Sequence, residues 1–324
     1  MTATAATAAT APRRRTLLGA ALAAALTAGC ATGCSAEEAP TRSLRLATGP
    51  EGGPYNAFGR SFTEAVNASG HLTLTPVSSA ASVDNLQQLA DGSVDLALTT
   101  ADVAEDAVLG RDSFDRPLGL TALARVYVNY LHLLAPADGP VRDLADLAGR
   151  RVATGAVGSG NQVTAGRLLR RAGVGVRQQS LGLAESLDGL RAGELDAVFW
   201  SGGVPTPAVA ALARELPLRF VPLDTVAAQL REHYGPVYTA VTLPAGAYGL
   251  ADPVPTLGVG NYLTARPGVP EDAVRHLLGI LFDQWATLLR SVTAGARLEP
   301  RFAVSTGAVP LHPGAAAYYR SVYG

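Results

Sequence analysis

The sequence contains no lysine, and all 26 of its basic side chains are arginines. Without lysine, a Walker-type phosphate loop, a Schiff base and a lysine general base are all excluded. Charged residues make up only 16% of the chain and the net charge is −1, so no basic field is present to attract nucleic acid. These absences exclude several kinds of covalent and phosphate chemistry.

Cysteine is scarce as well, and Cys30 and Cys34 are the only two. Because both lie near the N-terminus, the rest of the chain has neither a disulfide framework nor a cysteine nucleophile. The five histidines form no HExxH pair, and Ser159 lacks the glycine two positions earlier that a hydrolase nucleophile turn requires. We therefore expect no enzyme activity, no metal site and no cofactor.

The first segment with a positive signature is an export signal. Three arginines precede Thr16–Gly29, an uncharged run of 14 residues, whereas a membrane-spanning helix needs about 20. The junction that ends at Cys30 resembles a bacterial lipobox, whose cysteine is lipidated and becomes the mature N-terminus. We predict a lipoprotein signal peptide over residues 1–29 and a lipidated linker over residues 30–43.

Lipidation of Cys30 predicts an extracytoplasmic protein, held by lipid at the outer face of the cytoplasmic membrane. Cys34 follows a similar group of small residues and is a second candidate for the lipidated position. The alternative is a cleaved secretory signal in which the cysteine is incidental.

Beyond the linker, short apolar runs alternate with helical patterns. The strand candidate Leu44–Ala47 leads into a glycine-rich loop and then into helices predicted over Tyr55–Ala68 and Ser82–Asp91. The same order returns at the strand candidate Arg151–Ala153, which leads into the glycine-rich loop Thr154–Asn161. This alternation predicts an α/β fold with parallel strands, in which ligands bind where the strands end.

Two such halves predict a two-lobed molecule with a ligand cleft between the lobes. We assign residues 44–131 and 243–324 to lobe I, and residues 132–242 to lobe II. The apolar segments Tyr130–Leu134 and Tyr238–Leu243 are the expected connections between them. A cleft with two connecting strands can close on a ligand by a hinge motion.

The second glycine-rich loop permits three interpretations. Its GxxGxG spacing differs from the GxGxxG of dinucleotide-binding loops, so a nucleotide site is disfavoured. Ser159, Gly160 and Asn161 stand at the predicted start of a helix, where backbone N–H groups can hold an anion or a carbonyl group. A turn built only from small residues is the third interpretation.

Several segments resemble motifs of the TAXI family, the solute-binding proteins of one branch of TRAP (tripartite ATP-independent periplasmic) transporters. The motifs follow in the family's order and cover nearly all of the chain beyond the linker. The matching segments are Thr48–Gly59, Val83–Ala104, Val157–Gln162, Ala184–Ala208, Tyr238–Tyr248 and Pro310–Arg320.

The resemblance implies a periplasmic-binding-protein-like fold of type II, with a hinge and an interlobe cleft. It implies a monomer that captures a small carboxylate or amino acid, glutamate-like, glutamine-like or a 2-oxo acid, and delivers it to a TRAP membrane permease. The ligand-facing positions of the family map here to Thr48, Gly49, Gly52, Gly53, Tyr55, Asp102, Ser159, Gly160, Asn161, Trp200, Gly202 and Gly203.

One departure from the family motif bears on the ligand. Glu51 stands where the family has a small polar residue, and an acid in an anion pocket would repel the ligand. Either Glu51 points to solvent, or it pairs with a positive group on a zwitterionic ligand and so sets selectivity. Arg125, near the first connection, is a possible source of positive charge, although nothing in the sequence places it in the cleft.

Three other functions are consistent with the same chain. A ligand-sensing lipoprotein would dock on a membrane receptor kinase instead of a permease. An exported hydrolase or lyase would need a nucleophile and base that the sequence does not show. A structural surface lipoprotein would have a cleft that binds nothing.

Overall fold

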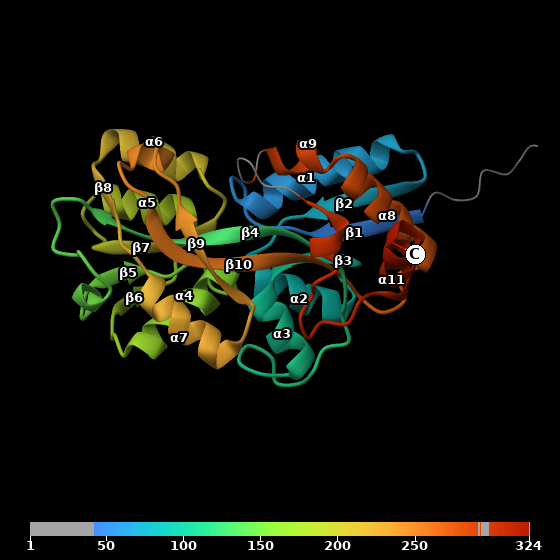
Figure 1. The fold of residues 1–324 in the computed structure, drawn as a ribbon, viewed down its shortest axis with the longest axis horizontal. Helices are drawn as coiled ribbons and strands as arrows, with labels where there is room; N and C mark the ends of the chain where they lie inside the picture. The colour runs from blue at the N-terminus through green and yellow to red at the C-terminus, as the bar shows by residue number, and fades with distance from the viewer. Residues whose placement is uncertain (1–41, 291, 293–297, 324) are drawn as a thin grey trace, which may run out of the picture. The chain divides into compact units, whose positions relative to one another are not determined.

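A mixed sheet of ten strands forms the centre of the computed structural model, which describes residues 42–290, 292 and 298–323 (Figure 1). The predicted signal peptide, with Cys30 and Cys34, lies outside these residues. The strands are β1 (Arg42–Ala47), β2 (Leu72–Val77), β3 (Leu96–Thr100), β4 (Thr121–Pro136), β5 (Arg151–Ala153), β6 (Arg177–Gln179), β7 (Ala197–Gly202), β8 (Leu218–Phe220), β9 (Tyr238–Leu243) and β10 (Val254–Ala265).

Helices follow most of the strands in the chain. They are α1 (Pro54–Ala68), α2 (Ser82–Asp91), α3 (Ala101–Leu109), α4 (Gly160–Ala172), α5 (Leu183–Arg191), α6 (Pro207–Glu215), α7 (Asp224–Tyr234), α8 (Glu271–Asp283), α9 (Trp285–Arg290), α10 (Pro300–Ala303) and α11 (Pro313–Tyr323). In the described part of the chain, no helix is both long and apolar enough to cross a membrane.

The strand order is β2-β1-β3-β10-β4-β7-β5-β6, with β8 added beside β4 and β9 beside β10. β1 runs parallel to β2 and β3, and β5 runs parallel to β6 and β7, as the strand–helix alternation predicts. β4 and β10 are antiparallel to each other and lie between the two parallel groups. The sheet therefore has a parallel group at each end, joined through two long antiparallel strands.

The connection between the groups differs from the prediction in one strand. Tyr130–Leu134 lies in β4 and pairs with β7, as expected of a connecting segment. Tyr238–Leu243 forms β9, which pairs with the first half of β10. The second half of β10, from Asn261 onwards, pairs with β3. The prediction that Tyr238–Leu243 is the second connection is therefore wrong, and β10 has that position.

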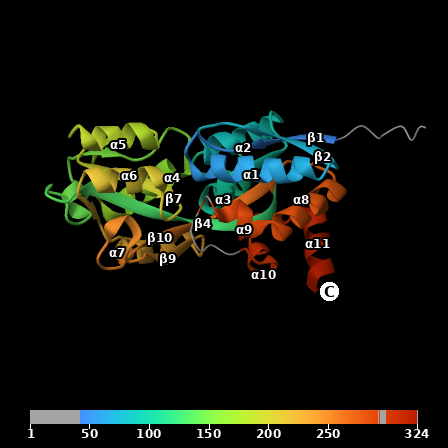
Figure 2. The same ribbon diagram turned by 90° about the horizontal axis from the view of Figure 1, so that it is seen from above.

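Helices cover both faces of the sheet (Figures 1 and 2). α1 is amphipathic, and it buries Phe58, Phe62 and Val66 against the β1–β3 end, where α8 and α9 pack beside it. α2, α3, α4 and α7 follow one another on the opposite face (Figure 1). This arrangement brings the first turns of helices from both parallel groups to the middle of the molecule.

Candidate binding site

A cavity of about 80 Å³ lies where the first turns of α1, α2, α4 and α5 converge. Its walls also include residues at the end of β3, in the middle of β4 and along β7. None of the residues that line it carries a charge, and most of its surface is apolar. A ligand in this cavity would therefore interact with backbone dipoles, hydroxyl and amide groups, and apolar walls.

The start of α4 presents two open backbone donors to the cavity. Ser159 is the N-cap, and its Oγ accepts a hydrogen bond from the Gln162 N–H at 3.2 Å. Among the described residues, no acceptor lies on the N–H of Gly160 or Asn161. No acidic residue stands in this first turn. The helix dipole and the two donors together make this end suited to an anionic group.

The start of α2 is joined to the glycine-rich loop before α4. The N–H groups of Val83 and Asp84 donate to the carbonyl oxygen of Gly158, at 2.9 and 3.4 Å. Ala81, the N-cap of α2, has φ 95°, a conformation that side chains other than glycine adopt only with strain. A hydrogen-bonded contact thus links the two parallel groups beside the cavity.

Of the two remaining helix ends, α1 lacks its first donor and α5 has an acid of its own. α1 begins with Pro54, which has no N–H, and the Gly53 N–H donates to the Pro50 carbonyl oxygen at 3.1 Å. At the start of α5, the Gly182 N–H donates to Glu185 Oε2 at 3.1 Å. The Glu185 carboxylate therefore offsets the positive end of α5.

Three oxygens that line the cavity lack partners. Thr100 Oγ1, Asn129 Oδ1 and Asn161 Oδ1 are buried, and no described residue forms a hydrogen bond with any of them. The Asn161 amide is oriented by its nitrogen, which donates to the Phe199 carbonyl oxygen at 2.8 Å. An unsatisfied buried oxygen costs about 1–3 kcal/mol. A solute that donates hydrogen bonds would remove this cost.

Tyr55 and Trp200 form the aromatic parts of the wall. The Tyr55 hydroxyl donates to Asn261 Oδ1 at 2.7 Å and lies 3.3 Å from Ser82 Oγ. Burial raises the pKa of Tyr55 above its ordinary value, so its hydroxyl stays protonated. The Trp200 indole N–H donates to Thr206 Oγ1 at 2.9 Å. Both rings are therefore held in place by hydrogen bonds.

Half of the residues predicted to face the ligand line this cavity: Gly53, Tyr55, Ser159, Gly160, Asn161 and Trp200. Thr48 lies behind it, with its hydroxyl donating to the Val77 carbonyl oxygen at 2.9 Å. Gly49 packs against Tyr55, and a Cβ at Gly202 would lie 2.5 Å from Trp200 Nε1, so both glycines make room for the aromatic walls. Gly52 and Gly203 line an adjoining open hollow.

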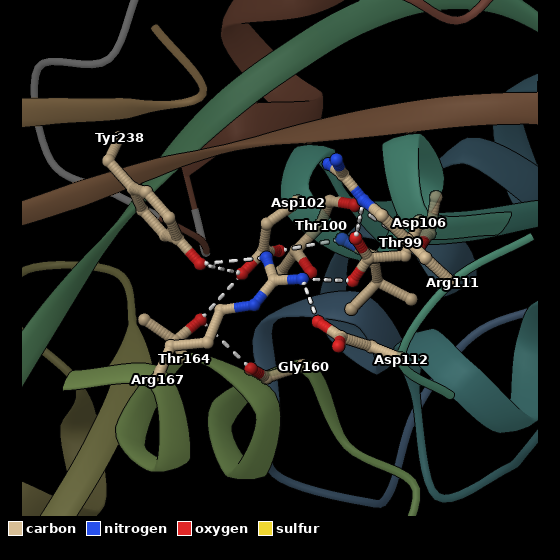
Figure 3. Close-up of polar contacts among 11 residues, drawn as sticks. Thr99, Thr100, Asp102, Asp106, Arg111, Asp112, Gly160, Thr164, Arg167 and Tyr238 are labelled. Carbon is tan, nitrogen blue, oxygen red and sulfur yellow. Dashed lines mark hydrogen bonds and ion pairs between the residues drawn. The ribbon is translucent and has the colours of Figure 1, made fainter. Parts of the chain in front are cut away.

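Asp102 lies outside the cavity, in a buried cluster between α3, α4 and β9 (Figure 3). Its Oδ2 accepts hydrogen bonds from the hydroxyls of Thr164 and Tyr238, at 2.9 and 2.8 Å. The Arg167 guanidinium forms ion pairs with Asp106 and Asp112 and lies 3.2 Å from the Tyr238 hydroxyl. The structure therefore corrects the expectation that Asp102 faces the ligand: it holds α3 against α4.

The two charged residues considered for ligand selectivity also lie outside the cavity lining. Glu51 is exposed, which is the first of the two alternatives that the sequence left open. Arg125 is half-buried on β4, where its side chain packs beside Gly260 of the neighbouring β10. Neither Glu51 nor Arg125 therefore contributes a charged side chain to the cavity.

Several lining residues were not predicted from the sequence. Asn129 is a polar residue inside the apolar run of β4, and this contrast is the signal that could have identified it. Ser82 has the pattern of a helix cap and nothing more. Gly182 and Ser186 reach the cavity because α5 begins there, a placement that depends on the tertiary fold.

The family comparison covers most of the chain. The model of the NMT1-like family matches residues 46–322, which includes every helix end at the cavity. This family corresponds to TAXI-type solute-binding proteins of TRAP transporters, so the resemblance inferred from the motifs is confirmed. Its members are solute-binding proteins and not enzymes.

Solved structures with a similar fold are periplasmic binding proteins. MatC from Rhodopseudomonas palustris with bound malate has a TM-score of 0.53 and 19% identity, over 78% of this chain and 89% of that one. A TctC solute-binding protein from Polaromonas has a TM-score of 0.50 and 18% identity, over 88% and 99%. BugD has a TM-score of 0.53 and 14% identity, over 78% and 87%. The predicted type II periplasmic-binding-protein fold is thus confirmed.

Proposed function

Because the chain belongs to the NMT1-like family and is an extracytoplasmic solute-binding protein of a transporter, we propose that it captures a small carboxylate or amino acid in the cavity described above. The convergence of four helix N-termini on a cavity without charged side chains carries this proposal. Helix N-termini attract anions, and the open N–H groups of Gly160 and Asn161 supply directed donors.

The glutamate-like, glutamine-like and 2-oxo acids implied by the sequence share a carboxylate group, which fits this chemistry. MatC, which shares the fold, holds malate, another small organic acid. We propose that the loaded protein delivers its solute to a TRAP-type permease, and that lipid on Cys30 anchors it at the outer face of the cytoplasmic membrane.

Capture and delivery require the cavity to open. We propose that two lobes move about β4 and β10, with the first boundary near residue 131 as the sequence indicates. The pairing of β10 with both β9 and β3 supports placing the second lobe boundary inside β10, later than residue 243. The hydrogen bonds between Gly158 and the start of α2 would form on closure and break on opening.

The experiment that tests this function is a thermal-shift screen of the full chain. The protein is first unfolded and refolded to remove any co-purified solute, and the panel holds glutamate, glutamine, 2-oxoglutarate, succinate and pyruvate. A ligand at a thousand times its dissociation constant stabilises by about 4 kcal/mol, which raises Tm by several degrees. A natively refolded protein whose Tm moves with no member of the panel would contradict the proposal.

A matched pair of variants locates the binding event. Asn161→Asp adds a negative charge at the start of α4, and we expect it to weaken binding of any carboxylate at least tenfold, about 1.4 kcal/mol. Asn67→Asp makes the same change at an exposed position near the end of α1 and is expected to leave the affinity unchanged. Equal affinity of the two variants would place the site elsewhere.

A further inference from the structure

We infer that the solute carries a single carboxylate, seated at the start of α4, and that the rest of it is neutral or cationic and donates hydrogen bonds. This inference rests on the proposed function and narrows it. It excludes dicarboxylates such as 2-oxoglutarate and glutamate and favours zwitterions with a neutral polar side chain.

The four helix ends are the sources of positive potential at the cavity. α4 combines two open N–H groups of cavity-lining residues, Gly160 and Asn161, with a first turn free of acidic residues. Asn161 also has an unpartnered Oδ1 and is only 7% exposed, so a buried acceptor that needs a donor group of the solute lies beside these two N–H groups. One carboxylate fits this position.

The other three ends are less able to hold a second carboxylate. The amides of Val83 and Asp84 at the start of α2 are already bonded to the Gly158 carbonyl oxygen, and Asp84 adds a negative charge there. Pro54 removes the first donor of α1, and of its two open N–H groups, at Tyr55 and Asn56, only that of Tyr55 belongs to a residue of the cavity lining. The Glu185 carboxylate caps α5, so a ligand carboxylate beside Gly182 would be repelled.

No side chain of the lining can compensate a second negative charge. The cavity contains no arginine or histidine, and the sequence contains no lysine at all. A second carboxylate would therefore be desolvated without a counter-charge, which is strongly unfavourable.

Three buried oxygens of the lining lack hydrogen-bond partners among the described residues. Asn129 Oδ1 and Asn161 Oδ1 can only accept, and Thr100 Oγ1 can accept or donate. An ammonium or amide group on the solute donates to such oxygens, whereas a carboxylate cannot. The apolar side chains of Leu181 and Leu183 form the wall beside them and suit a short aliphatic stem.

The test compares solutes that differ only by one amide in place of one carboxylate. Isothermal titration of the refolded full chain is performed with the pairs glutamine and glutamate, asparagine and aspartate, and succinamate and succinate. We expect at least one pair to bind, with the amide member at least tenfold tighter. A dicarboxylate that binds as tightly as its amide partner, or tighter, overturns the inference and leaves the proposed function standing. Absence of binding by all six solutes overturns the inference, and the proposed function falls as well only if the thermal-shift panel, which includes pyruvate and 2-oxoglutarate, also gives no response.

A charge-neutral variant at α5 gives a second, independent test. Glu185→Gln retains the side-chain cap of the helix but removes its charge. We expect dicarboxylate affinity to rise about two- to fivefold, the usual effect of one charge at a helix end, while affinity for the amide member stays constant. Glu194→Gln, an exposed residue just beyond the other end of α5, should change neither affinity. If Glu185→Gln leaves the ratio of the two affinities unchanged, the inference is wrong.

Discussion

Substituting Arg167 by methionine tests whether the buried cluster in Figure 3 holds α3 and α4 together. The guanidinium is only 1% exposed, lies over the Tyr234 ring at 4.3 Å and is paired with Asp106, whose side chain is also 1% exposed. Methionine has a similar length and no charge. The substitution therefore removes the cation while it leaves the packing nearly filled.

The size of the loss in stability depends on the interactions that Asp106 and Asp112 keep in the variant. Asp112 is 44% exposed and can be solvated by water. Asp106 keeps one partner, Arg111, whose Nε lies 2.7 Å from Asp106 Oδ1. Removing one member of a buried ion pair costs about 3–5 kcal/mol, and the retained Arg111 favours the lower end, so we expect a loss of about 3 kcal/mol.

The loss should also depend on pH. Burial raises the pKa of Asp106, and Arg167 acts in the opposite direction, so the variant should have a still higher Asp106 pKa. A carboxyl whose pKa is raised in the folded state stabilises the fold at low pH. This contribution is lost as pH rises through the raised pKa. The deficit of Arg167→Met should therefore be smaller at pH 5 than at pH 8.

Urea unfolding of the variant and the parent protein at these two pH values measures the free energies of unfolding. Arg191→Met is the matched control, because both of its ion pairs are exposed and worth at most about 1 kcal/mol. The double variant Arg167→Met with Asp106→Asn should recover part of the loss. If Arg167→Met loses no more than Arg191→Met at either pH, the reasoning about the cluster is refuted.

Two further predictions concern a buried histidine and a close contact. Burial lowers the pKa of His132 to about 4, so the stability it contributes is present above pH 6.5 and is lost as pH falls towards 4. Between pH 7 and pH 5 the free energy of unfolding should fall by about 2 kcal/mol because of His132. In urea titrations, His132→Gln should remove this fall. A variant with the pH profile of the parent protein would contradict the prediction. At Gly160, a Cβ would lie 2.6 Å from Thr100 Oγ1 and 2.7 Å from Ser82 Oγ, so Gly160→Ala should cost about 1–3 kcal/mol and weaken ligand binding. The control is Gly279→Ala in α8, where a Cβ would meet nothing within 4 Å, and this variant should be slightly stabilised. Calorimetry should give it a higher Tm than Gly160→Ala. The opposite order would disprove the close contact at Gly160.

Local patterns sufficed to predict the elements that build the cavity. The apolar spacing predicted α2 over Ser82–Asp91, which is the observed range, and α1 to within one residue. The strand and glycine-rich loop before α4 were also placed correctly, so Ser159, Gly160 and Asn161 were predicted to lie at a helix start. Such signals depend on neighbours a few residues apart, which a sequence displays directly.

Contacts between distant segments could not be predicted in this way. Asp102 matches a family motif, but its hydrogen bonds reach Thr164 and Tyr238, 62 and 136 residues away. The apolar segment of β9 has the composition of a connecting strand, and only its pairing with β10 shows that it is not one. The hydrogen bonds between Gly158 and the start of α2 join backbone groups, so no residue type in the sequence indicates them.

The most direct test of the binding site is a crystal structure of the refolded protein with the tightest solute from the titrations. We predict that a carboxylate oxygen of the solute accepts hydrogen bonds from the N–H groups of Gly160 and Asn161, inside the cavity walled by Tyr55 and Trp200. A solute found in the adjoining hollow beside Gly203, or a carboxylate held by an arginine side chain, would contradict the account.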